Sequence, residues 1–217
     1  VMPSLPNGIR LVVRENHAQP IVAVDVVVRG GASHDGEISG LAHMLEHLCF
    51  QRTQRYQSPL SAQHALELVG GSCNAMTTRD MTRFEGQVPS QHARLLIEVL
   101  AEIVLAADFS DEQIAGETEL IAHEIALAYE DPATWLVDQS YALTFTDFPY
   151  RHSPMGSIDQ LSRLTPSLAR AGYRRLYVPG NISIVVVGDI TQKAAREYVH
   201  AAFSRFPAGS PPSTLSY

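Results

Sequence analysis

The sequence has few cysteines and no long apolar run, and each shortage removes a class of protein; no export signal is visible. The two cysteines, Cys49 and Cys73, provide neither a disulfide framework nor the spacing of a zinc knuckle. No apolar stretch reaches the roughly 18 residues that a membrane span needs. We therefore predict a soluble protein of the cytoplasm or the periplasm. The compartment stays open, because a chain that begins at Val1 is typical of a trimmed start and a removed export signal leaves no trace.

The sequence also lacks an excess of positive charge. It has 16 Lys and Arg against 23 Asp and Glu, a formal net charge of -7, and no long block of like charge. Without a basic stripe to meet phosphates, nucleic acid is excluded as a main partner. A hydrophobic content of 45% and a charged content of 18% are typical of a globular protein. With 217 residues, the chain can bury a substantial core in one large domain or two small ones.

Apolar periodicity divides the chain into strands and helices that do not alternate regularly. We predict strands at residues 8–15, 21–29, 72–78, 81–88 and 181–190. We predict helices at residues 41–50, 61–68, 111–129, 157–162 and 165–177, a long one opened by Pro89-Ser90, one opened by Asp131-Pro132, and one from Thr191 to about Phe203. This order predicts an α+β fold, with a mixed, largely antiparallel sheet and helices packed on one face.

The same patterns predict the domain organisation. No internal repeat with a period of 20–50 residues is present. Residues 1–206 are expected to form one domain. Residues 207–217 are rich in Pro, Ser and Gly, which is typical of a linker or a free tail.

One pentapeptide, His43-Met44-Leu45-Glu46-His47, has a composition suited to metal binding. Its two histidines are four residues apart and its glutamate is three residues after the first, so all three share one face of a helix. Leucines occupy the other side of the same helix. Polar groups on a helix built for a core are costly unless something binds them. Zinc is the candidate, because two imidazoles bind it and a carboxylate activates its water. Two ordinary helical histidines remain the alternative at this point.

The predicted helix at 111–129 offers a third ligand for such a metal. Glu117 and Glu124 are two helical turns apart and lie on or beside its apolar stripe. A carboxylate on a core-facing stripe needs a cation or hydrogen-bond donors. The alternative is that both glutamates lie at the rim of the stripe, in solvent. His123 competes as a ligand, but it is rotated by about 100° from Glu124 around the helix, so we expect it to be exposed or to play a supporting role.

These residues together resemble the pitrilysin/insulinase family of zinc metallopeptidases, which includes the mitochondrial processing peptidases. H-x-x-E-H is the inverzincin signature, the reverse of the zincin motif. As in that family, a glutamate follows the motif after 76 intervening residues, at Glu124, and a second glutamate precedes it by one heptad, at Glu117. Residues 70–77, Gly-Gly-Ser-Cys-Asn-Ala-Met-Thr, are similar to the family's G-G-x-x-N-A-x-T strand. One local departure is Gln51-Arg52-Thr53, where many members have a glycine.

The resemblance implies a sandwich fold of the processing-peptidase type and a role for each motif residue. His43, His47 and Glu124 would bind one zinc ion per chain. Glu46 would be the catalytic general base, which takes a proton from the zinc-bound water. Glu117 would support catalysis by holding a ligand or its helix in place. The strand residues Asn74, Ala75 and Met76 would bind the substrate by pairing with an extended peptide.

The implied function is that of a zinc-dependent endopeptidase, which cleaves peptides or small unfolded proteins by attack of the zinc-bound water. Family members contain two or four domains of about this size, and this sequence holds one. We therefore expect a second homologous domain or subunit as a partner, and an incomplete enzyme in its absence. Two alternatives stay open: a non-catalytic binding or scaffold subunit of a peptidase-like assembly, and a zinc hydrolase that acts on a small molecule.

Overall fold

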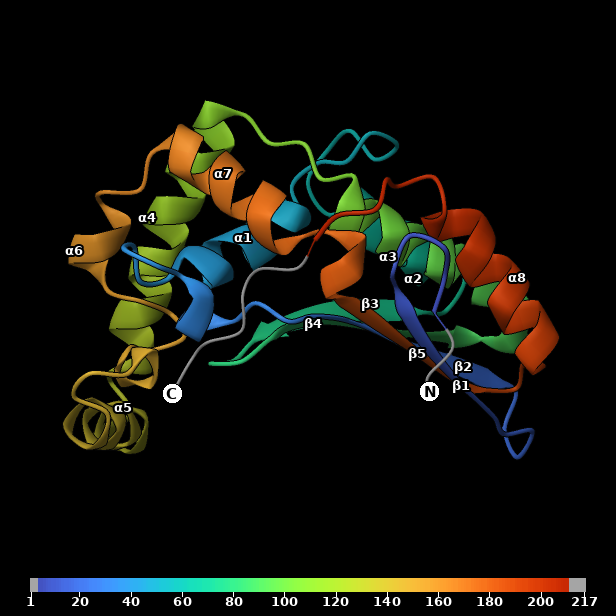
Figure 1. The fold of residues 1–217 in the computed structure, drawn as a ribbon, viewed down its shortest axis with the longest axis horizontal. Helices are drawn as coiled ribbons and strands as arrows, with labels where there is room; N and C mark the ends of the chain where they lie inside the picture. Colours follow the sequence, from blue (N-terminus) through green and yellow to red (C-terminus); the bar gives the residue numbers. More distant parts are fainter. Residues whose placement is uncertain (1–3, 211–217) are drawn as a thin grey trace.

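The computed structural model of the protein describes residues 4–210, and within them the chain forms one five-stranded sheet. The strand order is β1-β5-β2-β4-β3 (Figure 1). The strands are β1 (Arg10–Glu15), β2 (Ile21–Val28), β3 (Ser72–Thr77), β4 (Thr82–Pro89) and β5 (Ile182–Gly188). Strands β1 and β5 are parallel, and the other three neighbouring pairs are antiparallel. The predicted α+β class with a mixed, largely antiparallel sheet is confirmed.

Eight α-helices accompany the sheet within residues 4–210. They are α1 (Leu41–Cys49), α2 (Ser61–Glu67), α3 (Ala93–Leu105), α4 (Asp111–Ala128), α5 (Pro132–Thr144), α6 (Ile158–Leu161), α7 (Pro166–Leu176) and α8 (Gln192–Phe203). Short 3-10 turns lie at Ala32–His34, Ser90–His92, Pro149–Arg151 and Pro179–Asn181. The second of these explains why the long helix predicted from Pro89-Ser90 begins only at Ala93.

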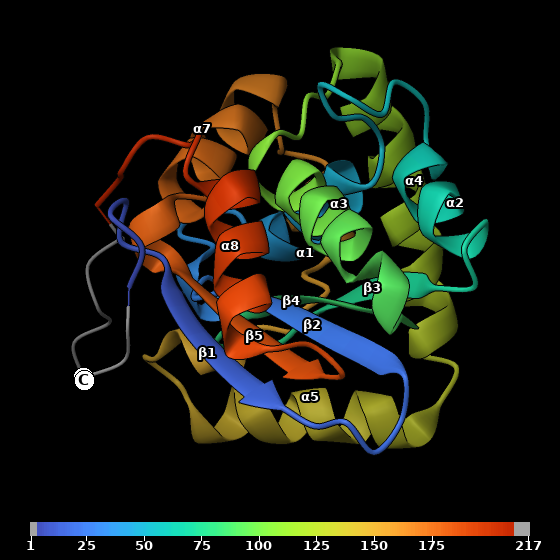
Figure 2. The same ribbon diagram turned by 90° about the vertical axis from the view of Figure 1, so that its right-hand side faces the viewer.

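The core lies between one face of the sheet and the helices. Along β2, Val22, Val24, Val26 and Val28 are buried, and the residues between them are exposed or half-buried. Because of this alternation, every second side chain of β2 points toward the helices, and the side chains between them point away. Figure 2 shows α1, α3 and α8 on the covered side of the sheet. Helices α4 and α7 pack against α1, so α1 is enclosed by neighbours on several sides.

Helix α5 is the exception to the prediction that helices pack on one face. In both ribbon views it stands apart from the other helices, below the level of the sheet (Figures 1 and 2). None of its residues is buried. It begins where predicted, because Asp131 accepts hydrogen bonds from the backbone N–H groups of Ala133 and Thr134 and Pro132 follows it.

Two predictions concern the ends and the surroundings of the chain. Of the predicted linker or tail at 207–217, residues 207–210 have no regular structure, and 211–217 lie outside the described residues, as do residues 1–3. Within residues 4–210, no helix has the length and the apolar character needed to cross a membrane.

Candidate metal centre

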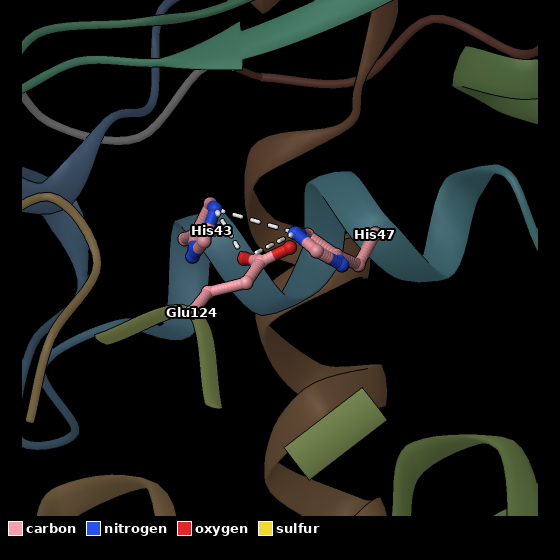
Figure 3. Close-up of side chains that lie close together, drawn as sticks. All are labelled: His43, His47 and Glu124. Carbon is pink, nitrogen blue, oxygen red and sulfur yellow. Dashed lines mark hydrogen bonds and ion pairs between the residues drawn. The ribbon is translucent and has the colours of Figure 1, made fainter. Parts of the chain in front are cut away.

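Helices α1 and α4 bring three predicted ligands to one point (Figure 3). The Nε2 atoms of His43 and His47 are 3.3 Å apart. The Oε2 atom of Glu124 lies 3.4 Å from Nε2 of His47 and 3.9 Å from Nε2 of His43. All three ligand atoms lie within 4.8 Å of one another, and within residues 4–210 no other group of three His, Cys, Asp or Glu side chains meets in this way.

The donor set fits a zinc ion. Burial, together with the charge of His47, lowers the pKa of His43 to about 4, so this imidazole is neutral near pH 7 and its lone pair is available. Its Nδ1 is buried and has no hydrogen-bond partner in the described part of the chain. With Nε2 of both imidazoles unprotonated, two ring nitrogens and a carboxylate oxygen face one another as three acceptors, an arrangement that a cation stabilises. Two His and one Glu are a ligand set of catalytic zinc sites.

The His47 ring is held from behind by Glu117. Its Nδ1 lies 2.9 Å from Oε2 of Glu117, which is buried. Burial lowers the pKa of His47, but the hydrogen bond to Glu117 and the charges of Glu124 and Glu46 outweigh it, so the pKa lies above its ordinary value. A proton on Nδ1 donates to Glu117 and leaves Nε2 free to face the other ligands. The Nε2 of Gln51 donates to the second oxygen of Glu117. No sequence pattern pointed to Gln51, which appears in the sequence only within the local departure Gln51-Arg52-Thr53.

The carboxyl group of Glu46 is buried between α1 and the sheet. Its Oε2 accepts a hydrogen bond of 2.5 Å from the hydroxyl of Thr77, on β3. Burial raises the pKa of Glu46, and the hydrogen bond from Thr77 opposes that rise. Thr82, on the neighbouring strand β4, donates to the carbonyl oxygen of Gly30, and its hydroxyl lies 3.2 Å from that of Thr77. The predicted base is therefore positioned by the same hairpin that carries the predicted substrate strand.

The start of α1 is set by Asp35, which no sequence pattern distinguishes from other acidic residues. Its carboxylate accepts hydrogen bonds of 2.7 Å from the backbone N–H groups of Gly40 and Ala42. Gly40 has a φ of 94°, and a Cβ there would lie 2.8 Å from the carbonyl oxygen of Met155, so the entry to the helix requires glycine. Burial raises the pKa of Asp35 to about 7, and the two backbone hydrogen bonds oppose the rise.

The predicted substrate-binding residues lie beside the metal centre. Asn74, Ala75 and Met76 are on β3, the edge strand of the sheet, which pairs only with β4 among the described strands. Strand β3 also packs against α1. On α4, His123 is exposed, as expected, and Glu119 is exposed as well. The structure thus places the predicted ligands, the predicted base and the edge strand near one another. The roles of these residues in binding and catalysis stay predictions.

Comparisons with known proteins identify the family and show how much of each relative this chain covers. Residues 10–157 match the protein family described as Insulinase (Peptidase family M16). An uncharacterized zinc protease of Mycobacterium leprae is 27% identical over 214 residues, which are 96% of this chain and 48% of the relative. The chain therefore spans about half the length of the curated relatives it matches.

Solved structures agree with the fold. A peptidase M16 inactive domain from Pseudomonas fluorescens has a TM-score of 0.90 at 17% identity, over 100% of this chain and 53% of that one. The first half of the periplasmic protease PqqL from Escherichia coli has a TM-score of 0.88 at 25% identity, over 100% of this chain and 48% of that half. In the whole of PqqL the share falls to 25%. The fold of this chain is thus a unit that accounts for about a quarter of that protein.

Proposed function

The chain belongs to peptidase family M16, the insulinase family, and we propose that it is the zinc-binding half of a metalloendopeptidase that cleaves peptides or small unfolded proteins. The observation that carries the proposal is that His43, His47 and Glu124 meet at one point. Glu46 directly precedes His47 in the sequence, and its carboxyl group accepts a hydrogen bond from Thr77. The zinc proteases among its relatives support the same assignment of metal.

Each residue has a defined task in this proposal. His43, His47 and Glu124 hold the ion, and Glu117 fixes the ring of His47 through Nδ1. When bound, zinc supplies a Lewis acid that polarises a peptide carbonyl and makes a water molecule easier to deprotonate. Glu46 takes the proton from the attacking water and passes it to the leaving amine. Burial raises the pKa of this carboxyl, which makes its ionised form a stronger proton acceptor.

The substrate is proposed to lie along β3. An extended peptide that pairs with the backbone of Asn74, Ala75 and Met76 adds one strand to the sheet at its edge. Because β3 packs against α1, such a strand runs beside the base and the metal ligands. Main-chain pairing of this kind selects unfolded or flexible segments, because a folded strand has its own partners.

A second domain is proposed to complete the enzyme. Relatives are about twice as long as this chain, and Glu124, whose side chain is 40% exposed, lies open to solvent. A site that excludes water strengthens its electrostatic interactions, so closure by another domain is expected to raise activity. In this proposal residues 1–206 form the zinc-binding domain and residues 207–217 lead to the next one.

The test measures zinc content and peptide cleavage of the full-length gene product. We expect one zinc per chain, its loss in His47→Ala, and retained zinc with at least a hundredfold loss of cleavage in Glu46→Gln. Glu119→Gln, an exposed position on α4, is the matched control and should resemble the parent protein. Cleavage is read by mass spectrometry on a library of unstructured peptides.

Three outcomes would contradict the proposal. Full activity in Glu46→Gln would remove the proposed base. A zinc-loaded protein that cleaves no peptide would favour the non-catalytic scaffold subunit. Hydrolysis restricted to small amides or esters would favour the small-molecule hydrolase. The isolated chain, loaded with zinc, should cleave the same peptides at least a hundredfold more slowly than the full-length product.

A further inference from the structure

Two threonine hydroxyls connect the predicted base to a backbone carbonyl. Oε2 of Glu46 lies 2.5 Å from Oγ1 of Thr77, which lies 3.2 Å from Oγ1 of Thr82. Oγ1 of Thr82 in turn lies 3.1 Å from the carbonyl oxygen of Gly30. Thr77 and Thr82 are directly opposite each other on β3 and β4, and Thr82 is fully buried. We call these two residues the threonine pair.

The number of hydrogens in these contacts limits how they can be arranged. Each threonine hydroxyl has one hydrogen to donate, and a backbone carbonyl has none. Because Gly30 can only accept, the hydroxyl hydrogen of Thr82 points to its carbonyl oxygen, and Thr82 can only accept from Thr77. Thr77 therefore has two acceptors for its single hydrogen, Glu46 on one side and Thr82 on the other.

The threonine pair can serve the carboxyl group of Glu46 both without and with a proton. An ionised carboxylate is the stronger acceptor, so Thr77 then donates to Glu46. When Glu46 holds the proton of the attacking water on Oε2, it donates to Thr77, and Thr77 donates to Thr82. All three contacts are then hydrogen bonds. Only the hydroxyl of Thr77 rotates between the two arrangements, and neither threonine loses its own hydrogen.

We propose that Thr82 is a positioning residue for the proton transfer, which acts through Thr77 and keeps the Glu46 carboxyl group in one place while it takes and returns the proton. The proposal rests on the function proposed above, in which Glu46 is the base. Thr82 has no contact with Glu46 in the hydrogen bonds of the described residues, and it gives the Thr77 hydroxyl its second orientation. Without the Thr82 hydroxyl, the hydrogen of Thr77 stays on Oε2 of Glu46 and opposes the arrival of a proton at that atom.

The first test measures peptide cleavage by the zinc-loaded full-length gene product. Thr82→Val, which keeps the shape of the side chain and removes the hydroxyl, should lower kcat by about tenfold or more. Its KM and zinc content should change by less than about twofold, because a fully buried residue does not reach the substrate. Thr82→Ser, which keeps the hydroxyl, should restore kcat to within about threefold of the parent. Equal kcat values in Thr82→Val and Thr82→Ser would overturn the proposal.

The matched control removes a hydroxyl from the same hairpin. Thr78→Val deletes a hydroxyl that donates to the carbonyl oxygen of Met81 within the β3–β4 turn. It should change kcat by less than about threefold, because this hydroxyl is not part of the threonine pair. A loss of kcat in Thr78→Val as large as that in Thr82→Val would assign the effect to the hairpin as a whole and overturn the proposal.

A double-mutant cycle shows whether Thr82 acts through Thr77. Thr77→Val removes the hydrogen bond to Glu46 and should lower kcat at least as much as Thr82→Val does. Adding Thr82→Val to Thr77→Val should lower kcat by less than about twofold more, because the residue through which Thr82 acts is already gone. A full additional loss of kcat in the double variant would indicate that Thr82 acts through packing, and would overturn the proposal.

Neutron diffraction of the deuterated parent protein tests the hydrogen arrangement without any activity measurement. The deuterium of the Thr82 hydroxyl should point to the carbonyl oxygen of Gly30. A Thr82 deuterium that points to Thr77 would overturn the proposal in a protein that cleaves peptides. A zinc-loaded parent protein that cleaves no peptide contradicts the proposed function itself, so the two failures are distinguished.

Discussion

The imidazole of His47 is held between two carboxylates, and the one behind it sets its orientation. Glu124 lies in front of Nε2, and Glu117 lies 2.9 Å from Nδ1. Gln51 in turn donates to Glu117, so a line of three side chains runs from the end of α1 across α4 and back to a predicted ligand. A ring whose Nδ1 is fixed loses less rotational freedom when Nε2 binds a metal.

Glu117→Ala is therefore expected to weaken zinc binding by roughly 10–100-fold. The variant leaves Nδ1 of His47 without an acceptor and frees the ring to rotate. Gln51→Leu should have a smaller effect, because Glu117 still reaches the ring. The measurement is the zinc dissociation constant, by competition with a chromophoric chelator. Glu119→Ala, an exposed position on the same helix, is the control. Equal affinities of the Glu117 and Glu119 variants would show that Glu117 does not position the ligand.

Asp35 ties the stability of the domain to pH. Burial raises the pKa of its carboxyl from 3.8 to about 7 in the folded protein. The folded state then holds this proton more tightly than the unfolded state, so the contribution to stability is complete below about pH 4 and is lost as the pH rises toward 7. Because Asp35 also accepts two backbone hydrogen bonds at the start of α1, the change acts on the helix that carries the pentapeptide.

We expect the free energy of unfolding to fall by about 1–3 kcal/mol more between pH 5 and pH 8 in the parent chain than in Asp35→Asn. Asn retains an acceptor at the start of the helix and does not titrate. Urea unfolding of both proteins at the two pH values gives the double difference, in which the titration of all other groups cancels. A double difference near zero would mean that Asp35 has an ordinary pKa in the folded protein.

Single site residues can be predicted from the sequence where their spacing is regular, but not where they contact a partner from a distant segment. His43, Glu46 and His47 share one helical face by arithmetic alone, and Glu124 follows from its position on an apolar stripe. Thr77, Gln51 and Asp35 have no such pattern, because each meets its partner only after distant segments pack. Gln51 and Glu117, for example, are 66 residues apart in the chain.

For helices and strands, the sequence predicts that an element forms but not where it lies in the fold. Apolar periodicity predicted β2 and α4, and Ser110 forms a capping box with Gln113 at the start of α4. The parallel pairing of β1 with β5 could not be derived, because the two strands lie at opposite ends of the chain. The exposure of α5 could not be derived either, since its leucines read like those of any core helix.

Breaking the Arg79–Asp138 ion pair should release α5 without unfolding the domain. Both side chains are largely buried, so Arg79→Met leaves the Asp138 carboxylate without its cation in a poorly solvated position. No residue of α5 belongs to the buried core, so the helix can open while the core stays intact. We expect α5 amides to exchange at least tenfold faster, and the free energy of unfolding measured by urea to change by less than about 1 kcal/mol.

The control is Arg83→Met, which breaks the more exposed ion pair of Arg83 with Glu85 on β4. The two side chains pair with each other, and exposed pairs contribute little, so the exchange of α5 should not change. Faster exchange across α3 as well as α5 in Arg79→Met would indicate global destabilisation and contradict the local role of the ion pair.

For the whole molecule, the predicted ligands come from two helices that lie far apart in the sequence. Helix α1 ends at Cys49 and α4 begins at Asp111, with two strands and two helices between them. A zinc ion bound by His43, His47 and Glu124 bridges the two helices only when the chain is folded. Binding to the folded state alone stabilises a protein by about 4 kcal/mol when the ligand concentration is a thousand times the dissociation constant.

Removing the metal should therefore lower the thermal midpoint. For a domain of this size each kcal/mol corresponds to roughly 2–4 °C, so saturating zinc should raise the midpoint of the isolated chain by about 8–16 °C over the chelator-treated form. Calorimetry with and without chelator measures the difference, and His47→Ala should show none. Magnesium, which prefers oxygen ligands, should not replace zinc at a site with two imidazoles. If the zinc-saturated and chelator-treated forms of the parent chain had the same thermal midpoint, zinc would not join α1 and α4. The three facing ligand atoms would then have to bind a different cation.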